Sequence, residues 1–174
     1  GNLADYRNFL KLAQYFNCID FLSGYPVEPI DVHASVRHLE ALQAAVLLTD
    51  KPFHAYSLGK ERVLDAIEIA RIGRGISHEQ LLQEPSLFSI INTNSPLKLD
   101  TPMAMGIIEM ARLNQICVVT PFTLMGAMAP ITLAGALVEQ NAEALAGLCL
   151  SQLARPGAPF VYGGFTSNVD MKSG

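Results

Sequence analysis

Apolar residues recur along this chain at two alternating spacings, one typical of helices and one typical of short buried strands. Residues 3–16 place aromatic and aliphatic side chains three and four positions apart, and residues 18–22 follow as a short apolar run. The same alternation continues through the sequence. It predicts further helices at residues 36–50, 60–72, 101–113 and 130–153, and further strands at residues 53–58, 87–91, 116–120 and 160–162.

Capping residues mark several of the predicted helix starts. Ser77, followed three positions later by Gln80, has the spacing of a capping box and predicts a short helix before Pro85. Asp100 or Thr101 precedes Pro102, which is favoured in the first helical turn. These signals separate the helices from the strands that precede them.

Five predicted strands that alternate with helices indicate right-handed βαβ units and a parallel sheet, so the fold class is α/β. Two architectures fit this pattern: an open doubly wound sheet, or part of a (β/α)₈ TIM barrel, which needs about 250 residues when complete. The chain has 174 residues and no linker-like change in composition. In the barrel interpretation, residues 1–174 form a partial catalytic domain of about five βα units, with no second domain.

The composition is unusually poor in charge for a soluble domain. Apolar residues make up 50% of the chain and charged residues 16%, against about 25% charged in an average domain. Part of the surface is therefore expected to be covered by a partner subunit or by further chain, and the full-length protein is expected to be a homo-oligomer. The net charge of −4 and the scattered basic residues argue against nucleic-acid binding.

Residues 113–138 contain no charged residue and are long enough to be considered as a membrane span. They are interrupted, however, by Pro121, Gly126, Pro130 and Gly135. The first part is a short β-branched run and the last part is rich in Ala and Leu. This segment is expected to form a buried strand, a loop and a helix rather than a span.

Cys18, Cys117 and Cys149 lie far apart in apolar surroundings, without the spacing of a zinc site or a disulfide framework. They are expected to be buried thiols in a reducing compartment, which favours a cytoplasmic location and no directly bound metal.

Polar residues collect after the predicted strands, where both architectures place their active sites. Any one of these residues could be an ordinary turn former, but four such groups would meet at one edge of the sheet. Phe122, Tyr162 and Phe165 are interleaved with them, which indicates a small polar or cationic ligand. The candidate site residues are His54, Tyr56, Asn92, Asn94, Thr120, Thr123, Gly163, Gly164, Thr166, Asn168 and Asp170.

Three runs in this sequence carry a likeness to a known family. They are the segment from Thr120-Pro-Phe-Thr through Pro130 to Ala134-Gly-Ala136, the turn Arg155-Pro-Gly-Ala-Pro159, and the segment from Tyr162-Gly-Gly-Phe to Lys172-Ser-Gly174. Together they resemble the trimethylamine methyltransferase superfamily, and Asn92-Thr-Asn-Ser-Pro-Leu97 extends the likeness.

The resemblance implies a (β/α)₈ barrel longer than this chain. It also implies an enzyme that moves a methyl group from a methylated amine to a corrinoid (cobalamin) carried by a cognate partner protein. Such a transfer needs positioning and desolvation more than a general acid, because a quaternary ammonium leaves as a neutral amine. A site of neutral hydrogen-bonding groups and aromatic rings suits that task.

The resemblance also suggests roles for the candidate residues. Thr120, Thr123, Thr166, Asn168 and Asp170 are expected to line the barrel mouth from the matching motifs. Asn92 and Asn94 approach it from the third strand, whereas His54 and Tyr56 rest on strand-end position alone. Gly163 and Gly164 allow a close backbone approach to ligand or corrinoid, or simply a bend.

Several alternatives stay open at this point. The sequence shows no nonstandard residue, whereas methanogen members of the family that act on trimethylamine carry pyrrolysine. If the full-length chain also lacks pyrrolysine, a quaternary amine such as glycine betaine is a better substrate prediction than trimethylamine. A complete flavodoxin-like binding or regulatory module, or an assembly subunit whose apolar faces serve only oligomerisation, would also fit the pattern.

Overall fold

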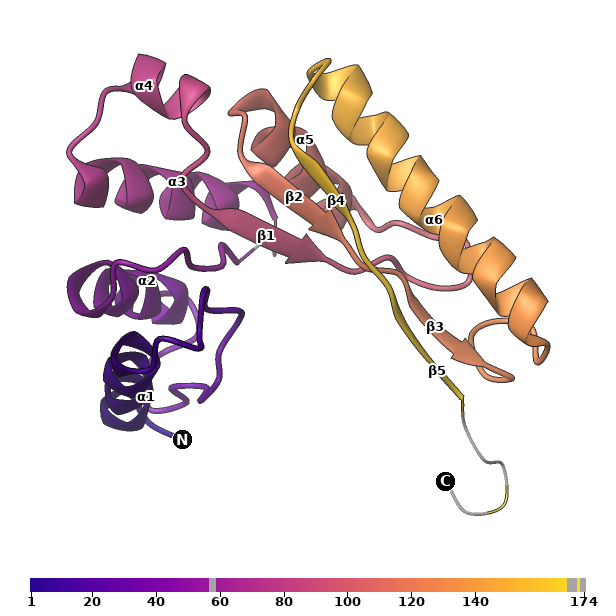
Figure 1. Ribbon diagram of the computed structural model, residues 1–174, viewed down its shortest axis with the longest axis horizontal. Coiled ribbons are helices and arrows are strands. Elements are labelled where there is room, and N and C mark those ends of the chain that lie inside the picture. The colour runs from indigo at the N-terminus through magenta and orange to yellow at the C-terminus, as the bar shows by residue number, and fades with distance from the viewer. Residues whose placement is uncertain (57–58, 169–171, 173–174) are drawn as a thin grey trace.

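The structure is a computed structural model that describes residues 1–56, 59–168 and 172 (Figure 1). The helices of the described residues are α1 (Leu3–Tyr15), α2 (Arg37–Leu48), α3 (Lys60–Arg74), α4 (His78–Gln83), α5 (Thr101–Arg112) and α6 (Leu133–Ala154). The strands are β1 (Phe88–Ile91), β2 (Ile116–Val119), β3 (Phe122–Met125), β4 (Phe160–Tyr162) and β5 (Phe165–Asn168).

The predicted caps are present. Ser77 and Gln80 form a reciprocal capping box at the start of α4, and the carboxylate of Asp100 accepts from the backbone N–H of Met103 at the start of α5. Helix α6 begins at Leu133, three residues later than predicted, because Thr132 caps it through the N–H of Gly135. Local chemistry therefore determines where these helices begin.

The parallel segments lie side by side in their order along the chain. Strand β2 pairs with β1 on one side and with β4 on the other, both in parallel. On the amino-terminal side, isolated parallel bridges join Leu22 to Phe53 and His54 to Phe88. This consecutive order lacks the reversal that defines a doubly wound sheet, so the flavodoxin-like alternative does not describe these strands.

The prediction of full strands is wrong in extent for residues 18–22 and for residues 53–56, while residues 57 and 58 of the second predicted strand lie outside the described residues. Leu22 and Phe53 form only a single bridge with each other, and His54 forms one with β1. Within the part of the chain that the structure describes, residues 18–22 have a pairing partner on one side only, and Pro52 has no N–H to extend the ladder. The predicted strands at residues 87–91, 116–120 and 160–162 are confirmed as β1, β2 and β4.

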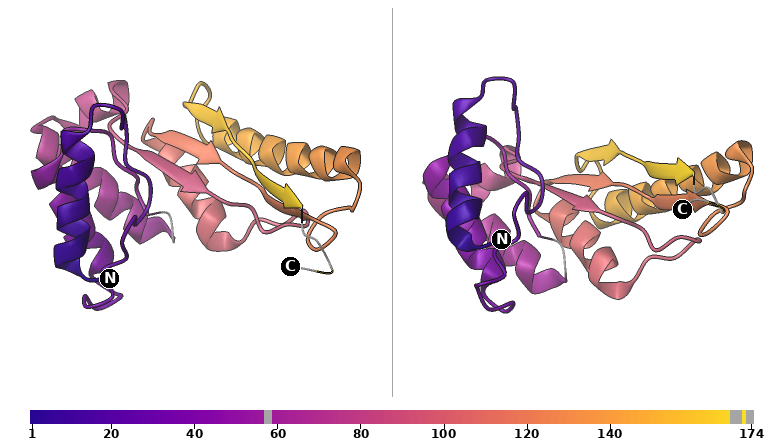
Figure 2. Two further views of the ribbon diagram at one scale, coloured as in Figure 1. Left: turned by 60° about the horizontal axis from the view of Figure 1, so that its bottom comes forward. Right: turned by 90° about the horizontal axis from the view of Figure 1, so that it is seen from below.

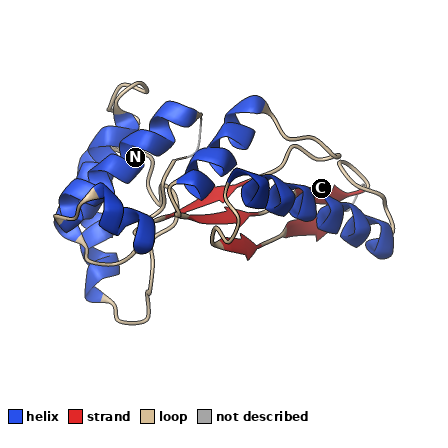
Figure 3. Cartoon of the chain, turned by 90° about the horizontal axis from the view of Figure 1, so that it is seen from above, coloured by secondary structure: helices blue, strands red, loops and turns tan. Residues whose placement is uncertain are grey.

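The helices pack in a row that follows the chain, each long helix against the next: α1 on α2, α2 on α3, α3 on α5 and α5 on α6. In Figure 1 the three paired strands lie in front of α5, and Figure 3 shows α6 running along them. Gly147 allows α6 to approach closely, because a Cβ at this position would lie 3.0 Å from Cγ1 of Val119. The helix row therefore covers one face of the strands.

Side chains alternate between this covered face and an open face. Ile91, Cys117 and Val119 on the covered face are completely buried, and burial raises the pKa of Cys117 to about 12. On the open face, Val161 retains 45% of its exposure. A shallow apolar depression runs along the open face, lined by Asp20, Phe21, Pro52, Phe88, Ile90, Ile116, Val118 and Val161.

Beyond the main sheet, β3 and β5 form a second parallel pair that continues β2 and β4 in unchanged register. The backbone N–H of Phe165 donates to the carbonyl of Pro121 across the break, at 2.9 Å. Figures 1 and 2 show this extension beside the first turns of α6. Pro121 has no N–H, so the ladder loses one donor there, and pairing resumes at Phe122. The prediction of a loop directly after Thr120 is therefore wrong.

Within the described residues, no helix combines the length and the hydropathy needed to cross a bilayer. The uncharged residues 113–138 instead contribute β2, β3, a turn and the start of α6. The prediction of three buried thiols is correct only for Cys117. Cys18 is exposed in the turn after α1, and Cys149 is exposed on α6.

Candidate functional site

The carboxyl ends of β1, β2 and β4 border an open pocket on the open face, with a volume of about 350 Å³. It continues the apolar row of that face toward the β3–β5 extension. The residues that line it are uncharged: Ile90, Asn92, Thr120, Phe122, Gly164 and Phe165. Five of these belong to the strand-end groups and aromatic residues singled out by the sequence pattern, and Ile90 completes the wall.

Asn92 and Thr120 meet directly after their strands end. The hydroxyl of Thr120 donates to the side-chain oxygen of Asn92 at 2.5 Å. Asn92 lies two residues after Ile90, and Thr120 lies two residues after Val118, so both continue the open face. They extend this apolar row with polar groups. The structure thus brings together two predicted site residues that are 28 positions apart in the chain.

The two glycines are explained by packing in this structure. A Cβ on Gly163 would lie 2.5 Å from Cγ2 of Thr120, and a Cβ on Gly164 would lie 2.9 Å from Cδ of Gln140. Each glycine therefore allows a neighbouring side chain to reach the ladder at the break between β4 and β5. The predicted approach of a ligand or corrinoid to these glycines stays a prediction.

An aromatic pair forms the outer wall of the pocket. The rings of Phe122 and Phe165 are stacked, with centroids 4.8 Å apart and planes 9° from parallel. Phe165 remains 56% exposed. An exposed phenyl face carries the negative side of a ring quadrupole, which attracts a cation even when that cation cannot donate a hydrogen bond.

Thr123 and Thr166 point to the other side of the same ladder, toward α6. Their hydroxyls are 2.6 Å apart, and the Thr166 hydroxyl donates to the side-chain oxygen of Gln140. Thr123 is completely buried. The structure brings these two predicted residues together, but behind the aromatic pair rather than in the pocket.

Asn94 belongs to the loop between β1 and α5. Its side-chain oxygen accepts from the backbone N–H of Asp100 at 2.9 Å, and its backbone pairs with Lys98. Asn168 is exposed at the end of β5, in register with Met125, and is not part of the pocket wall. Asp170 lies outside the described residues.

His54 and Tyr56 lie in the amino-terminal half, where His54 bridges to Phe88 of β1 and Tyr56 is buried in the core. The His54 ring makes edge contacts with Tyr56 and Phe88, and burial lowers its pKa to about 4, with a smaller opposing effect of the Ile90 backbone. Tyr56 stacks on Tyr25 at 3.9 Å. Burial, followed by the neighbouring phenols of Tyr6 and Tyr25, raises the pKa of Tyr56. These residues form an uncharged aromatic cluster apart from the pocket.

Sequence reasoning missed two residues of α6 that support the site. Gln140 contacts the β3–β5 ladder, and Glu143, 4% exposed, binds the loop after β1. The Glu143 carboxylate accepts from the hydroxyls of Thr93 and Ser95 and from the N–H of Leu97. A buried acid in an otherwise almost uncharged helix was the available signal, since Glu139 and Glu143 are its only charged residues.

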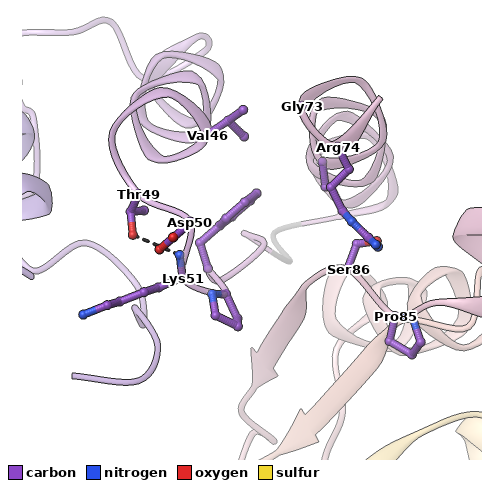
Figure 4. Close-up of a pocket in the computed structure, with 11 residues that line it drawn as sticks. Val46, Thr49, Asp50, Lys51, Gly73, Arg74, Pro85 and Ser86 are labelled. Atoms are coloured by element: carbon purple, nitrogen blue, oxygen red, sulfur yellow. Dashed lines mark hydrogen bonds between the residues drawn. The ribbon is translucent and has the colours of Figure 1, made fainter. Parts of the chain in front are cut away.

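A second cavity, of about 430 Å³, lies at the amino ends of the strands (Figure 4). Its two cations are already engaged. The Lys51 ammonium donates to the carbonyls of Ala13 and Phe16, and Arg74 binds Glu84 and Ser86. Neither cation is therefore free to bind a ligand, and the pocket at the carboxyl ends, where predicted site residues meet, is the better candidate site.

A family model described as trimethylamine methyltransferase (MTTB) matches residues 1–174. The chain therefore belongs to the trimethylamine methyltransferase family, and the sequence resemblance is confirmed.

Curated relatives support this membership. The chain is 38% identical over 172 residues to the glycine betaine methyltransferase of Desulfitobacterium hafniense (strain Y51), covering 99% of this chain and 36% of that protein. It is 30% identical over 171 residues to the trimethylamine methyltransferase MttB of Methanosarcina thermophila, covering 98% and 35%. The chain thus spans about a third of the length of the relatives it matches.

Proposed function

We propose that the full-length protein transfers a methyl group from a quaternary or tertiary methylated amine to a corrinoid carried by a partner protein. The observation that carries this proposal is the uncharged pocket at the carboxyl ends of consecutive parallel strands, with Phe122 and Phe165 as its outer wall. The names of the relatives, which are glycine betaine and trimethylamine methyltransferases, support the same chemistry.

The strands and helices described above are proposed to form part of a (β/α)₈ barrel. Consecutive parallel strands with one row of helices on a single face are the arrangement of a barrel wall. The open face would then be the barrel interior, where Val, Ile and Leu side chains pack in layers. Ile90, Val118 and Val161 would point into this interior, below the polar pair Asn92 and Thr120.

The pocket lining suits a methylated ammonium group. A quaternary ammonium has no N–H to donate, so it is held by aromatic faces and by exclusion of water. Phe122 and Phe165 supply the faces, and Asn92 and Thr120 supply neutral hydrogen-bonding groups beside them. A neutral amine leaves such a site without a proton donor, which agrees with the uncharged lining.

The open side of the pocket also fits the docking of a bulky planar cofactor carried by a partner. Gly164 has no side chain and the ring of Phe165 is half-exposed, so the pocket is accessible from solvent at the carboxyl ends of the strands. The corrinoid, when docked, supplies the cobalt nucleophile that accepts the methyl group. This chain's own residues hold the amine, orient one methyl group toward the mouth and exclude water.

Glycine betaine is the proposed substrate, ahead of trimethylamine. Identity to the glycine betaine methyltransferase of D. hafniense is 38%, against 32% for the trimethylamine methyltransferase MttB of D. hafniense (strain DSM 10664 / DCB-2). The carboxylate of glycine betaine would then be bound by residues beyond this pocket wall.

The test uses the full-length protein with a partner corrinoid protein reduced to Co(I). Addition of glycine betaine is expected to convert the Co(I) absorption spectrum to that of methyl-cobalt, with slower or absent conversion on trimethylamine. Conversion only on trimethylamine would overturn the substrate assignment. No conversion across a panel of quaternary and tertiary methylamines would overturn the proposed function.

A further inference from the structure

The back of the β3–β5 ladder is held by a directional chain of hydrogen bonds. A threonine hydroxyl has one proton, and the proton of Thr166 is donated to the side-chain oxygen of Gln140. The contact of 2.6 Å between the hydroxyls of Thr123 and Thr166 must therefore be donated by Thr123. The order of donation is Thr123 to Thr166 to Gln140.

This chain of hydrogen bonds lies directly behind the aromatic pair. Thr123 follows Phe122 in β3, and Thr166 follows Phe165 in β5, with both pairs in register. Successive residues of a strand point to opposite faces, so fixing the two threonines against α6 fixes the two phenylalanines toward the pocket. The amide of Gln140 also occupies the space beside Gly164, at the break in the ladder.

The ladder has little other support on this side. It contains two short strands, β3 and β5, and the helix that contacts β3 is α6. A two-stranded ribbon is only marginally stable in isolation. A partly buried side-chain contact from α6 is therefore well placed to set the position of the rings.

We propose that Gln140 is a positioning residue for the methylammonium site: through Thr166 and Thr123 it holds Phe122 and Phe165 in the orientation that binds the substrate cation. This inference rests on the proposed function. Gln140 does not touch the substrate in this account and acts only through the ladder.

The test measures KM and kcat of the full-length enzyme for glycine betaine with the Co(I) corrinoid protein. Gln140→Ala is expected to raise KM about tenfold and to leave kcat within about twofold, because the aromatic faces are no longer aligned with the cation. Thr166→Val should have the same effect, and the double variant should be no worse than either single variant, since both break one chain. Thr166→Ser retains the hydroxyl and should restore KM.

Gln152→Ala is the matched control. Gln152 lies on the same helix, and its side chain bonds to the N–H of Gly157 and the carbonyl of Ala158, remote from the pocket. Its replacement should leave KM unchanged.

Three results would overturn the inference while leaving the proposed function intact: an active Gln140→Ala enzyme with unchanged KM, a Thr166→Ser enzyme as impaired as Thr166→Val, or an equal rise of KM in Gln152→Ala. A wild-type enzyme that methylates no corrinoid from any amine would instead overturn the proposed function, and this inference with it.

Discussion

The two faces of the parallel strands differ in what covers them, although they alternate residue by residue along the same chain. On one face, Ile91 and Val119 are completely buried under the helices. On the other, Val161 keeps 45% of its exposure, and its neighbours in register, Val118 and Ile90, are only partly buried. Both faces are apolar, so the difference lies in their surroundings rather than in the side chains.

This comparison explains the low charge of the chain. A surface of Val, Ile and Phe on the open face would be unfavourable in water, at about 25 cal/mol for each Å² of apolar area. In the proposed barrel, this face is the interior, and the polar groups needed by the site appear only where the strands end, at Asn92 and Thr120. The predictions below test that assignment.

The largest expected effect comes from placing a charge on each face of β2 in the full-length protein. Val119→Asp should cost roughly 4 kcal/mol in the free energy of unfolding, because an unpaired carboxylate would be buried under α6. If the open face is a barrel interior, Val118→Asp should cost a similar amount. Urea unfolding of both variants decides the matter, and a cost below about 1 kcal/mol for Val118→Asp would argue against a closed barrel.

A smaller loss is expected from Glu143→Ala on the covered side. The substitution leaves the hydroxyls of Thr93 and Ser95 and the N–H of Leu97 without their shared acceptor. Hydrogen bonds to charged groups contribute about 1.5 to 3 kcal/mol each but are not additive, so a total near 3 kcal/mol is expected. Glu139→Ala, one turn earlier on α6, is the control and should cost less. Equal losses in the two variants would contradict the assigned role of Glu143.

The buried imidazole of His54 predicts that the free energy of unfolding depends on pH. Burial lowers its pKa to about 4, below the unfolded value of about 6.5, so the unfolded state binds the proton more readily between these values. The stability that comes from keeping His54 uncharged in the folded state is fully present above about pH 6.5. It should fall by roughly 3 kcal/mol in total as the pH drops to 4.

The measurement is urea unfolding at several pH values between 7 and 4. His54→Gln should flatten the profile, whereas His78→Gln, at a side chain with 74% exposure, should leave it unchanged. An unaltered slope in His54→Gln would show that other groups cause the pH dependence.

The smallest effect concerns the pocket wall itself. Phe165→Leu keeps an apolar side chain and removes the aromatic face, which should cost about 1 kcal/mol of cation binding and raise KM for glycine betaine about fivefold. Phe165→Tyr should retain near-normal KM. Steady-state kinetics of the full-length enzyme would contradict the proposed role of the ring if leucine and tyrosine behaved alike.

The sequence pattern was sufficient for the helices and for the central strands, because their apolar periodicity and caps are local. Ser77 and Asp100 cap helices as predicted. The pattern failed where pairing depends on distant chain: residues 18–22 form a single bridge, and β3 appears where a loop was expected, paired with β5. Strand pairing is a non-local interaction, so a short apolar run alone does not determine it.

The site shows the same limit. Strand-end position was enough to bring Asn92 together with Thr120, since parallel strands end at a common edge. It could not show that Thr123 and Thr166 turn toward α6, or that Gln140 and Glu143 reach the site from that helix, because these contacts join segments 26 to 50 residues apart. Side-chain direction at the break in the ladder depends on Pro121 and the two glycines, which the alternation pattern does not describe.

The most direct test of the central claim is a crystal structure of the full-length protein with glycine betaine bound. The account predicts that the open face of β1, β2 and β4 lies inside a closed barrel, with the quaternary nitrogen within about 6 Å of the ring centroid of Phe122 or Phe165. An amine bound away from the carboxyl ends of these strands, or an open face exposed to solvent in the full-length protein, would contradict it.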